Sequence, residues 1–322
     1  MWRPALLLLA LLLPPSSSSR AAARPSVAPV AADIDSGLVG RWDITIQTPE
    51  GSRPSWLELW VSGRDALVGR FVGIVGSARP IAAVQVGKGD SIHFAIPHQW
   101  ENGDGELTVD GRLTGGRLAG TMTFPDGKRF AWTGVQAPAL RGDVTPTWGA
   151  PIHLLHVNDL GGWQAQGGAQ NQWVVKNGDL RSPHSGANIE TTQKFKDFKL
   201  HIEFRYPKES NSGVYLRGRH EVQIQDDYGL PPMDDRFSGV YGFISPSRIA
   251  AKRAGEWNTY DITLVGRMVT VVANGVRVIC NQEIPGPTGG AIDSDEGAPG
   301  PLLLQGDHGP IEYRNIIITP AR

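Results

Sequence analysis

The stretch NSGVYLRGRHEVQIQD, residues 211–226, decides the fold of the second half of the chain. From Glu221 onward polar and apolar residues alternate, and the side chains of a strand point to opposite faces with a period of two. We expect a strand whose apolar face packs between two sheets and whose polar face looks into a groove or the solvent. The polar members are Glu221, Gln223 and Gln225, and the apolar members are Val222 and Ile224.

The rest of the second half also has strand character. Asn274-Gly275 is a strong hairpin signal. Strands are expected at 173–180, 189–195, 198–206, 212–227, 257–264, 268–272 and 311–319. Long strands with few helical stretches and Greek-key-length connections predict a two-sheet sandwich of jelly-roll type over residues 152–322.

The first half repeats short alternating strands between Gly, Asp-Gly and Pro turns, among them Asp110-Gly111, Gly115-Gly116 and Asp126-Gly127. Strands are expected near 40–48, 54–62, 65–76, 79–87, 90–97, 104–111, 116–123 and 128–136. This spacing predicts a small up-and-down β-barrel over residues 37–137, which makes the whole chain all-β. The Gly40 and Trp42 pair looks like the opening of lipocalin-like barrels, although a core tryptophan beside a turn is the preferred interpretation.

The N-terminus has the plan of a signal peptide, with Arg3, an apolar run at 5–13 and small residues up to Ala23. We expect residues 1–23 to direct export to a periplasm or to the outside of the cell, and residues 24–36 to be disordered. The apolar run is too short to span a bilayer, so no membrane span is expected. Proline and glycine without periodicity at 138–151 predict a linker between two domains.

Charge and cysteine content limit the function classes. The formal net charge is -1 and the 31 basic residues are scattered, which disfavours nucleic-acid binding. Cys280 is the only cysteine, so neither an intrachain disulfide nor a cysteine-based metal site can form. Because Cys280 ends an apolar run, we interpret it as a buried, inert thiol. Signatures of phosphate loops, zinc sites and serine nucleophiles are absent.

Several motifs follow one another in the second half, from Leu160-Gly161-Gly162-Trp163 through Asn211-Ser212-Gly213 and Glu256-Trp257-Asn258 to a closing run at 304–315. In their order and spacing they resemble the 3-keto-disaccharide hydrolase family over roughly residues 155–320. The resemblance implies a concanavalin-like jelly roll that cleaves glycosides with a ketone at C3. Such a ketone acidifies the C2 proton, so the route is β-elimination of the C1 oxygen followed by addition of water. That route needs a base, an acid and a group that stabilises the enolate.

Candidate site residues come from the matching motifs. Glu221 and His308 are the expected acid and base, in either assignment. Arg217, or a bound divalent cation, would stabilise the enolate, and no other cofactor is expected. Asp226, which lies on the apolar side of an ideal strand unless a bulge turns it, could orient His308 or help to bind the cation. The side chains expected to bind sugar hydroxyls are Gln223, Gln305 and Asp307.

Alternatives remain open at this point. Glu221, Gln223 and Asp226 also resemble the acidic strand of laminarinase-type glycoside hydrolases, although the middle position there is a carboxylate. A non-catalytic carbohydrate-binding protein would share the groove, and a scaffold in a surface assembly is a third possibility. Each motif also has a purely structural interpretation, namely a solvated sheet face, an exposed turn at Asp307-His308, and a cross-strand ion pair of Arg217.

Overall fold

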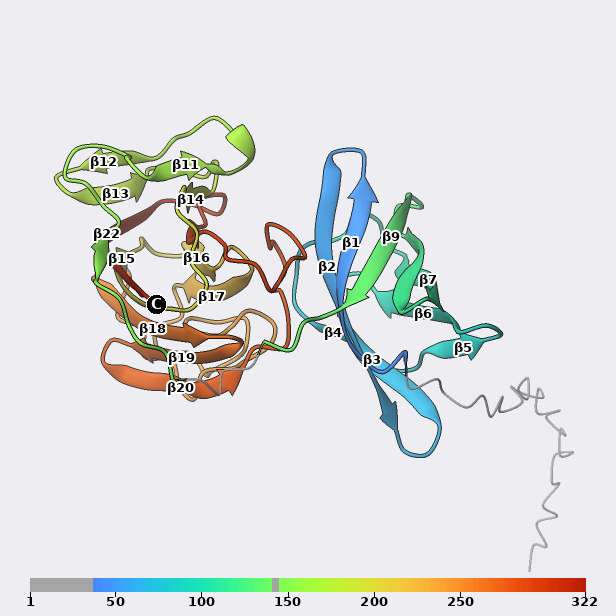
Figure 1. Cartoon of the computed structure of the whole chain (residues 1–322). Helices are drawn as coiled ribbons and strands as arrows, with labels where there is room; N and C mark the ends of the chain where they lie inside the picture. Colours follow the sequence, from blue (N-terminus) through green and yellow to red (C-terminus); the bar gives the residue numbers. More distant parts are fainter. Residues whose placement is uncertain (1–36, 141–144) are drawn as a thin grey trace, which may run out of the picture. The chain divides into compact units, whose positions relative to one another are not determined.

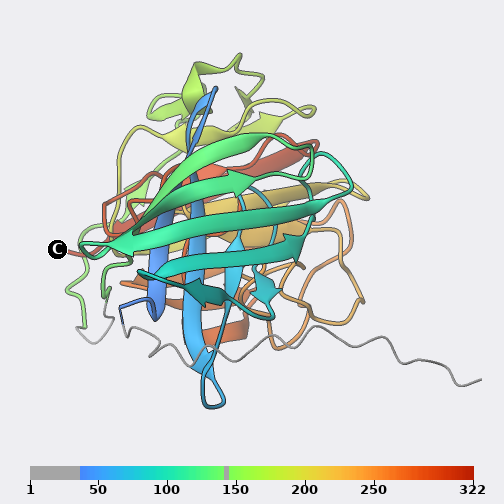
Figure 2. The same cartoon turned by 90° about the vertical axis from the view of Figure 1, so that its right-hand side faces the viewer.

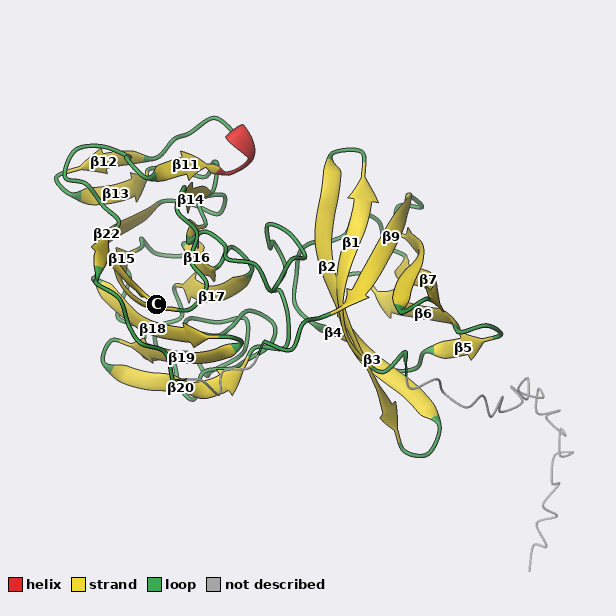
Figure 3. Ribbon diagram, viewed as in Figure 1, coloured by secondary structure: helices red, strands yellow, loops and turns green. Residues whose placement is uncertain are grey.

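The computed structural model describes residues 37–140 and 145–322, and strands make up nearly all of its regular structure (Figures 1 and 3). Within these ranges the single helical element is the short 3-10 helix η1 (Gln166–Gly168). The predicted all-β class is confirmed. The predicted signal peptide, the disordered segment at 24–36 and positions 141–144 of the expected linker lie outside the described residues. In the described part of the chain, no helix is long and apolar enough to cross a membrane.

The first half folds into one antiparallel sheet in the order β4-β3-β2-β1-β9-β8-β7-β6-β5. Figure 2 shows the later strands of this sheet, from β6 to β9, lying side by side. Consecutive strands are neighbours except for β4 and β5, which lie at opposite ends of the sheet, and β1 pairs with β9. This is an up-and-down order. Closure into a lipocalin-like barrel stays a prediction, because the chain of pairings ends at β4 and β5. The strands are β1 (Gly40–Thr48), β2 (Gly51–Ser62), β3 (Ala66–Val72), β4 (Arg79–Ile81), β5 (Gln85–Gly87), β6 (Ser91–Pro97), β7 (Glu106–Thr114), β8 (Arg117–Thr123) and β9 (Arg129–Gln136).

Two predictions for this sheet were wrong in detail. The strand expected at 79–87 is two strands, because the backbone bends before Val84, whose N–H bonds to Leu67 O (2.8 Å), and β4 and β5 pair with different neighbours. Asp110-Gly111 lies inside β7 and is not a turn. A Cβ atom on Gly111 would lie 2.5 Å from Trp132 Cζ2, so the glycine leaves room for a core indole. Trp42 is fully buried and donates to Leu38 O (3.0 Å), as expected of a core tryptophan.

The second half is a sandwich of two antiparallel sheets around one apolar core, as predicted. One sheet has the order β12-β13-β22-β15-β18-β19-β20, with β10 also paired to β22, and the other has the order β11-β14-β21-β16-β17. The strands are β10 (Ile152–His153), β11 (Trp163–Ala165), β12 (Val174–Lys176), β13 (Asp179–Ser182), β14 (Ile189–Thr191), β15 (Phe198–Arg205), β16 (Asn211–Leu216), β17 (His220–Gln225), β18 (Asn258–Val265), β19 (Met268–Ala273), β20 (Val276–Glu283), β21 (Leu303–Leu304) and β22 (Ile311–Pro320).

Two segments expected as single strands are hairpins. Residues 173–180 turn at Asn177-Gly178, where both residues have positive φ. Residues 212–227 turn at Arg217-Gly218, with φ of 54° and 68°, so β16 and β17 lie side by side. Partners in an antiparallel pair point to the same face, so both arms turn their aliphatic side chains into the core. The fold therefore sets the polar side chains of β17 directly beside those of β16.

Cys280 corrects another expectation, because it is exposed and not buried. The pairing of β19 with β20 shifts register around Val271, and Val278 and Ile279 are both buried. This irregularity turns the next residue, Cys280, toward the solvent. The division of the chain into two domains with a linker at 138–151 stays a prediction, since residues Ala32–Arg322 form one compact unit.

Candidate functional site

Five of the seven predicted site residues line one cavity of ≈ 510 Å³. The polar face of β17 supplies two of them, and the loop that follows β21 supplies the other three. These five are Glu221, Gln223, Gln305, Asp307 and His308. Further lining residues that the sequence analysis missed are Val75, Gly76, Trp100, Asn188, Asn211, Tyr215, Tyr241, Gly289 and Gly290.

Glu221 is the most deeply buried carboxyl group of the cavity, with 4% of its surface exposed. Its cross-strand partner Tyr215 places the phenol oxygen 2.8 Å from Glu221 Oε2 and 3.1 Å from Gly289 O. Burial raises the pKa of Glu221 to about 8, against a smaller lowering by the Tyr215 hydrogen bond. Burial therefore favours the protonated form of this carboxyl near neutral pH. The carboxyl can then donate to the phenol oxygen while the phenol donates to Gly289 O, so that each proton has an acceptor.

The glycine of the Asn-Ser-Gly motif makes room for this carboxyl group. A Cβ atom on Gly213 would lie 2.2 Å from Glu221 Oε1, far inside van der Waals contact. The preceding Ser212 is fully buried and donates to Gln305 O (2.7 Å). Gly213 O in turn accepts a hydrogen bond from Gln305 N (3.0 Å). The motif thus joins the strand that faces Glu221 to the loop that carries the histidine.

His308 and Asp307 form a half-exposed pair with 2.6 Å between His308 Nδ1 and Asp307 Oδ1. This hydrogen bond, reinforced by the charge of Asp307, raises the pKa of His308 even though partial burial lowers it. With Nδ1 held by the carboxylate, Nε2 is the ring nitrogen left for a ligand. The loop is fixed by Gly306 N, which donates to Asn188 Oδ1 (2.8 Å).

Two glutamines add neutral hydrogen-bonding groups to the cavity. Gln305 is 9% exposed, and its Oε1 is buried without a partner among the described residues. Gln223 makes only long contacts through Nε2, at 3.4 Å to both Gln225 Oε1 and Asp235 O. A buried polar atom that lacks a partner costs free energy, so Gln305 Oε1 is suited to accept a hydrogen bond from a ligand, whereas Gln223 Oε1 already accepts one from Ile224 N (3.2 Å).

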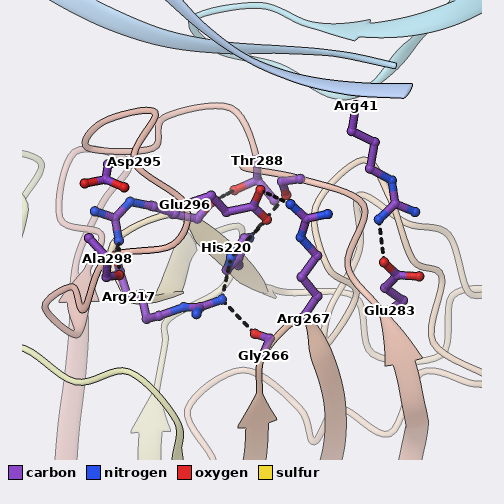
Figure 4. Close-up of polar contacts among 12 residues, drawn as sticks. Arg41, Arg217, His220, Gly266, Arg267, Glu283, Thr288, Asp295, Glu296 and Ala298 are labelled. Carbon is purple, nitrogen blue, oxygen red and sulfur yellow. Dashed lines mark hydrogen bonds and ion pairs between the residues drawn. The ribbon is translucent and has the colours of Figure 1, made fainter. Parts of the chain in front are cut away.

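Arg217 corrects the expectation that it stabilises an enolate in the cavity. Figure 4 shows its guanidinium directed toward Gly266 and His220, with Nη2 2.8 Å from Gly266 O and 3.2 Å from His220 Nε2. Arg217 is not among the residues that line the cavity. It is fully buried, and burial lowers its pKa to about 10. The positive φ at the hairpin turn is the physical reason, because it directs residue 217 off the face that carries Glu221. The cross-strand ion pairs with Glu203 or Glu221 are not formed either.

Asp226 also lies outside the cavity. Its Oδ2 accepts a hydrogen bond from Glu209 N (3.1 Å), and the residue follows the end of β17. Asp307 takes the place beside His308 that Asp226 was expected to fill. Among residues 37–140 and 145–322, no group of three His, Cys, Asp or Glu side chains is arranged to hold a metal ion.

The cluster around Arg217 contains two buried carboxyl groups, those of Asp43 and Glu296. Arg267 Nη2 lies 2.5 Å from Glu296 Oε2, and Asp43 of β1 is 3% exposed. Burial, and then the charge of Glu296, raises the pKa of Asp43 to about 8, and burial also raises that of Glu296. Figure 4 shows Arg267 and Glu296 facing each other beside His220. None of these residues lines the cavity.

Comparison with known proteins agrees with the resemblance seen in the sequence. The model of the 3-keto-alpha-glucoside-1,2-lyase-like domain matches residues 152–319. No curated protein matches the chain. Among solved structures, a "putative glycosyl hydrolase" from Parabacteroides distasonis is 32% identical with a TM-score of 0.46, covering 52% of this chain and 82% of that chain. Another structure with the same description, from the same organism, is 24% identical with a TM-score of 0.41, and the match covers 53% of this chain and 98% of that chain. The matched residues, 152–319, make up more than half of the chain, so the chain belongs to the 3-keto-alpha-glucoside-1,2-lyase-like family.

Proposed function

We propose that the protein cleaves glycosides whose sugar ring carries a ketone at C3, by elimination across C1 and C2 followed by hydration. Family membership supports a carbohydrate-acting enzyme. The observation that carries the finer proposal is the pairing, in one cavity, of a buried carboxyl whose protonated form is favoured near neutral pH with a histidine held by a carboxylate. Environments that move two titratable groups in this way suit them to acid and base roles.

His308 is the base in this proposal. Its Nε2 takes the C2 proton, and the C–H electron pair forms the C2–C3 double bond of an enolate on the former ketone. The enolate then restores the ketone and forms the C1–C2 double bond, while the bond from C1 to the leaving oxygen breaks. The departing oxygen needs a proton, and the protonated Glu221 supplies it. Asp307 stabilises the imidazolium that exists between these steps.

The second stage reverses these roles. The carboxylate of Glu221 takes a proton from water as the hydroxyl oxygen adds to C1, and His308 returns its proton to C2. Both groups regain their starting states, and the sum is hydrolysis of the glycoside. Since Arg217 is outside the cavity, the enolate oxygen in this proposal accepts hydrogen bonds from the amide N–H groups of Gln223 and Gln305.

The test uses a 3-keto-disaccharide and its unoxidised parent with the purified protein, following release of the second sugar. We expect cleavage of the keto form alone, with at least a 100-fold loss of rate in His308→Ala and Glu221→Gln. His201→Ala is a matched control, because His201 forms a similar pair with Asp261 (2.7 Å) on the surface of the other sheet. Equal activity of His308→Ala and His201→Ala would exclude His308 as the general base.

Cleavage of the unoxidised parent would instead indicate ordinary hydrolysis by paired carboxylates. That outcome would need Glu221 and Asp307 as the pair, since Asp226 lies outside the cavity and position 223 is a glutamine. A non-catalytic carbohydrate-binding protein is the second candidate, and the exposed Trp100 beside neutral amides favours it. Binding of sugar without cleavage of either compound would select that candidate.

A further inference from the structure

We infer that the N-terminal sheet forms one wall of this cavity, with Trp100 as the platform for the leaving group of the glycoside. The inference rests on the proposed function and adds to it a specificity-determining residue. The family match begins at residue 152, so this wall comes from outside the matched domain. The ligand at this wall is a ring with an apolar face, such as the C–H face of a second pyranose.

The cavity itself contains residues from both halves of the chain. Val75, Gly76 and Trp100 line it together with Glu221 and His308. The Trp100 side chain is unusually open for its size, with 66% of its surface exposed, and Val75 is 47% exposed. Large apolar groups left in water beside a polar cavity favour contact with a ligand, because covering them removes apolar surface from water.

The loop that carries Trp100 is braced and not free. The Glu101 carboxylate accepts hydrogen bonds from Gln99 N (2.8 Å) and from Arg79 Nη2 (2.6 Å), and this ion pair is nearly buried. Arg79 also donates to Pro97 O (2.9 Å), at the end of β6. A ring platform loses little conformational freedom on binding when its backbone is already fixed.

Close backbone contacts connect this wall to the reacting groups. Gly290 N donates to Ile74 O (2.9 Å), and a Cβ atom on Gly289 would lie 2.3 Å from Gly76 O. Only glycine fits at such an approach. Gly289 O is also an acceptor of the Tyr215 hydroxyl, which contacts the Glu221 carboxyl.

Beyond Trp100 a second cavity of ≈ 250 Å³ continues along the N-terminal sheet. Val75 and Trp100 line both cavities, so the indole stands between them. The second cavity also contains Arg53, Asp126 and other charged side chains. A substrate that extends past its leaving-group ring would therefore meet hydrogen-bonding groups on the far side of the indole.

The test compares two keto substrates of the full-length protein, a 3-keto-disaccharide and a 3-keto methyl glycoside whose leaving group has no ring. Trp100→Ala should raise KM for the disaccharide about 10-fold, as expected for loss of one aromatic contact, and change the methyl glycoside less than about 2-fold. Trp100→Phe, which keeps an aromatic ring, should have a KM for the disaccharide close to that of the wild type. Trp60→Ala is the matched control, because Trp60 is an exposed tryptophan on β2 that does not line this cavity.

Equal changes for both substrates, or no change for either, would overturn the inference. If the wild-type protein cleaves neither compound, the proposed function fails, and calorimetric titration of the disaccharide into the wild type and Trp100→Ala still decides the inference. Binding about 10-fold weaker in Trp100→Ala supports the platform. Equal binding by the two proteins overturns it.

Discussion

Replacing Glu221 by glutamine should make the protein more stable in alkaline solution while removing its activity. Raising the pKa of this carboxyl from 4.5 to about 8 corresponds to about 5 kcal/mol at about 1.4 kcal/mol per pH unit. Between these two pH values the folded protein keeps the proton and the unfolded chain loses it, so the wild type loses stability as the pH rises. Glutamine has the same shape and does not titrate, so the variant lacks this loss.

Urea unfolding at pH values from 5 to 9 measures the effect. The free energy of unfolding of Glu221→Gln minus that of the wild type should rise by about 1.4 kcal/mol per pH unit and level off above pH 8. Thr114→Ser, a change at an exposed position of β7 that involves no titratable group, should give a difference that does not depend on pH. A constant difference for Glu221→Gln as well would refute a protonated Glu221, and with it the assignment of this residue as the acid.

Three further changes test the surroundings of the site. Gly213→Ala places a methyl group 2.2 Å from Glu221 Oε1 and should cost about 1–3 kcal/mol in urea unfolding with at least a tenfold loss of activity; an unaffected rate would contradict the close packing. Asp307→Asn removes the charge that raises the pKa of His308, so the acidic limb of the profile of kcat/KM against pH should move to lower pH; an unmoved limb argues against His308 as the base. Asp43→Asn should raise the melting temperature above pH 7, with the gain shrinking toward pH 4, because burial raises the pKa of Asp43 to about 8; scanning fluorimetry at several pH values would reveal a gain of the wrong sign.

The alternation at 221–225 predicted that Glu221, Gln223 and Gln225 share one face of the strand; the first two line the cavity and Gln225 does not. Val222 and Ile224 are fully buried in the core, while Glu221 and Gln223 line the cavity, as a period of two requires. The Asn274-Gly275 hairpin was predicted for the same kind of reason, since a local signal specified a local structure. Such features depend on neighbours in sequence, and the sequence displays them directly.

Arg217 was placed wrongly because a non-glycine residue with positive φ has no reliable sequence signal. Without that turn, residues 212–227 are interpreted as one strand. In one continuous strand Arg217 would point to the same face as Glu221, because the two are four positions apart and side chains alternate with a period of two. The hairpin also hid Tyr215, whose contact with Glu221 exists only because β16 and β17 pair. A missed turn therefore produced both an incorrect site residue and an overlooked one.

Contacts between the two halves of the chain are beyond prediction from local patterns. Gly76 and Gly289 are more than two hundred positions apart, yet the Gly76 backbone leaves no room for a Cβ atom at position 289, which would lie 2.3 Å from Gly76 O. Gly289 is also the residue whose carbonyl accepts from Tyr215, and so its position determines how the Glu221 proton is shared. In our proposal the reacting groups and the Trp100 wall belong to one site, because the same short segment contacts both the N-terminal sheet and Tyr215, the neighbour of Glu221. The matched domain alone would then lack one wall of that site.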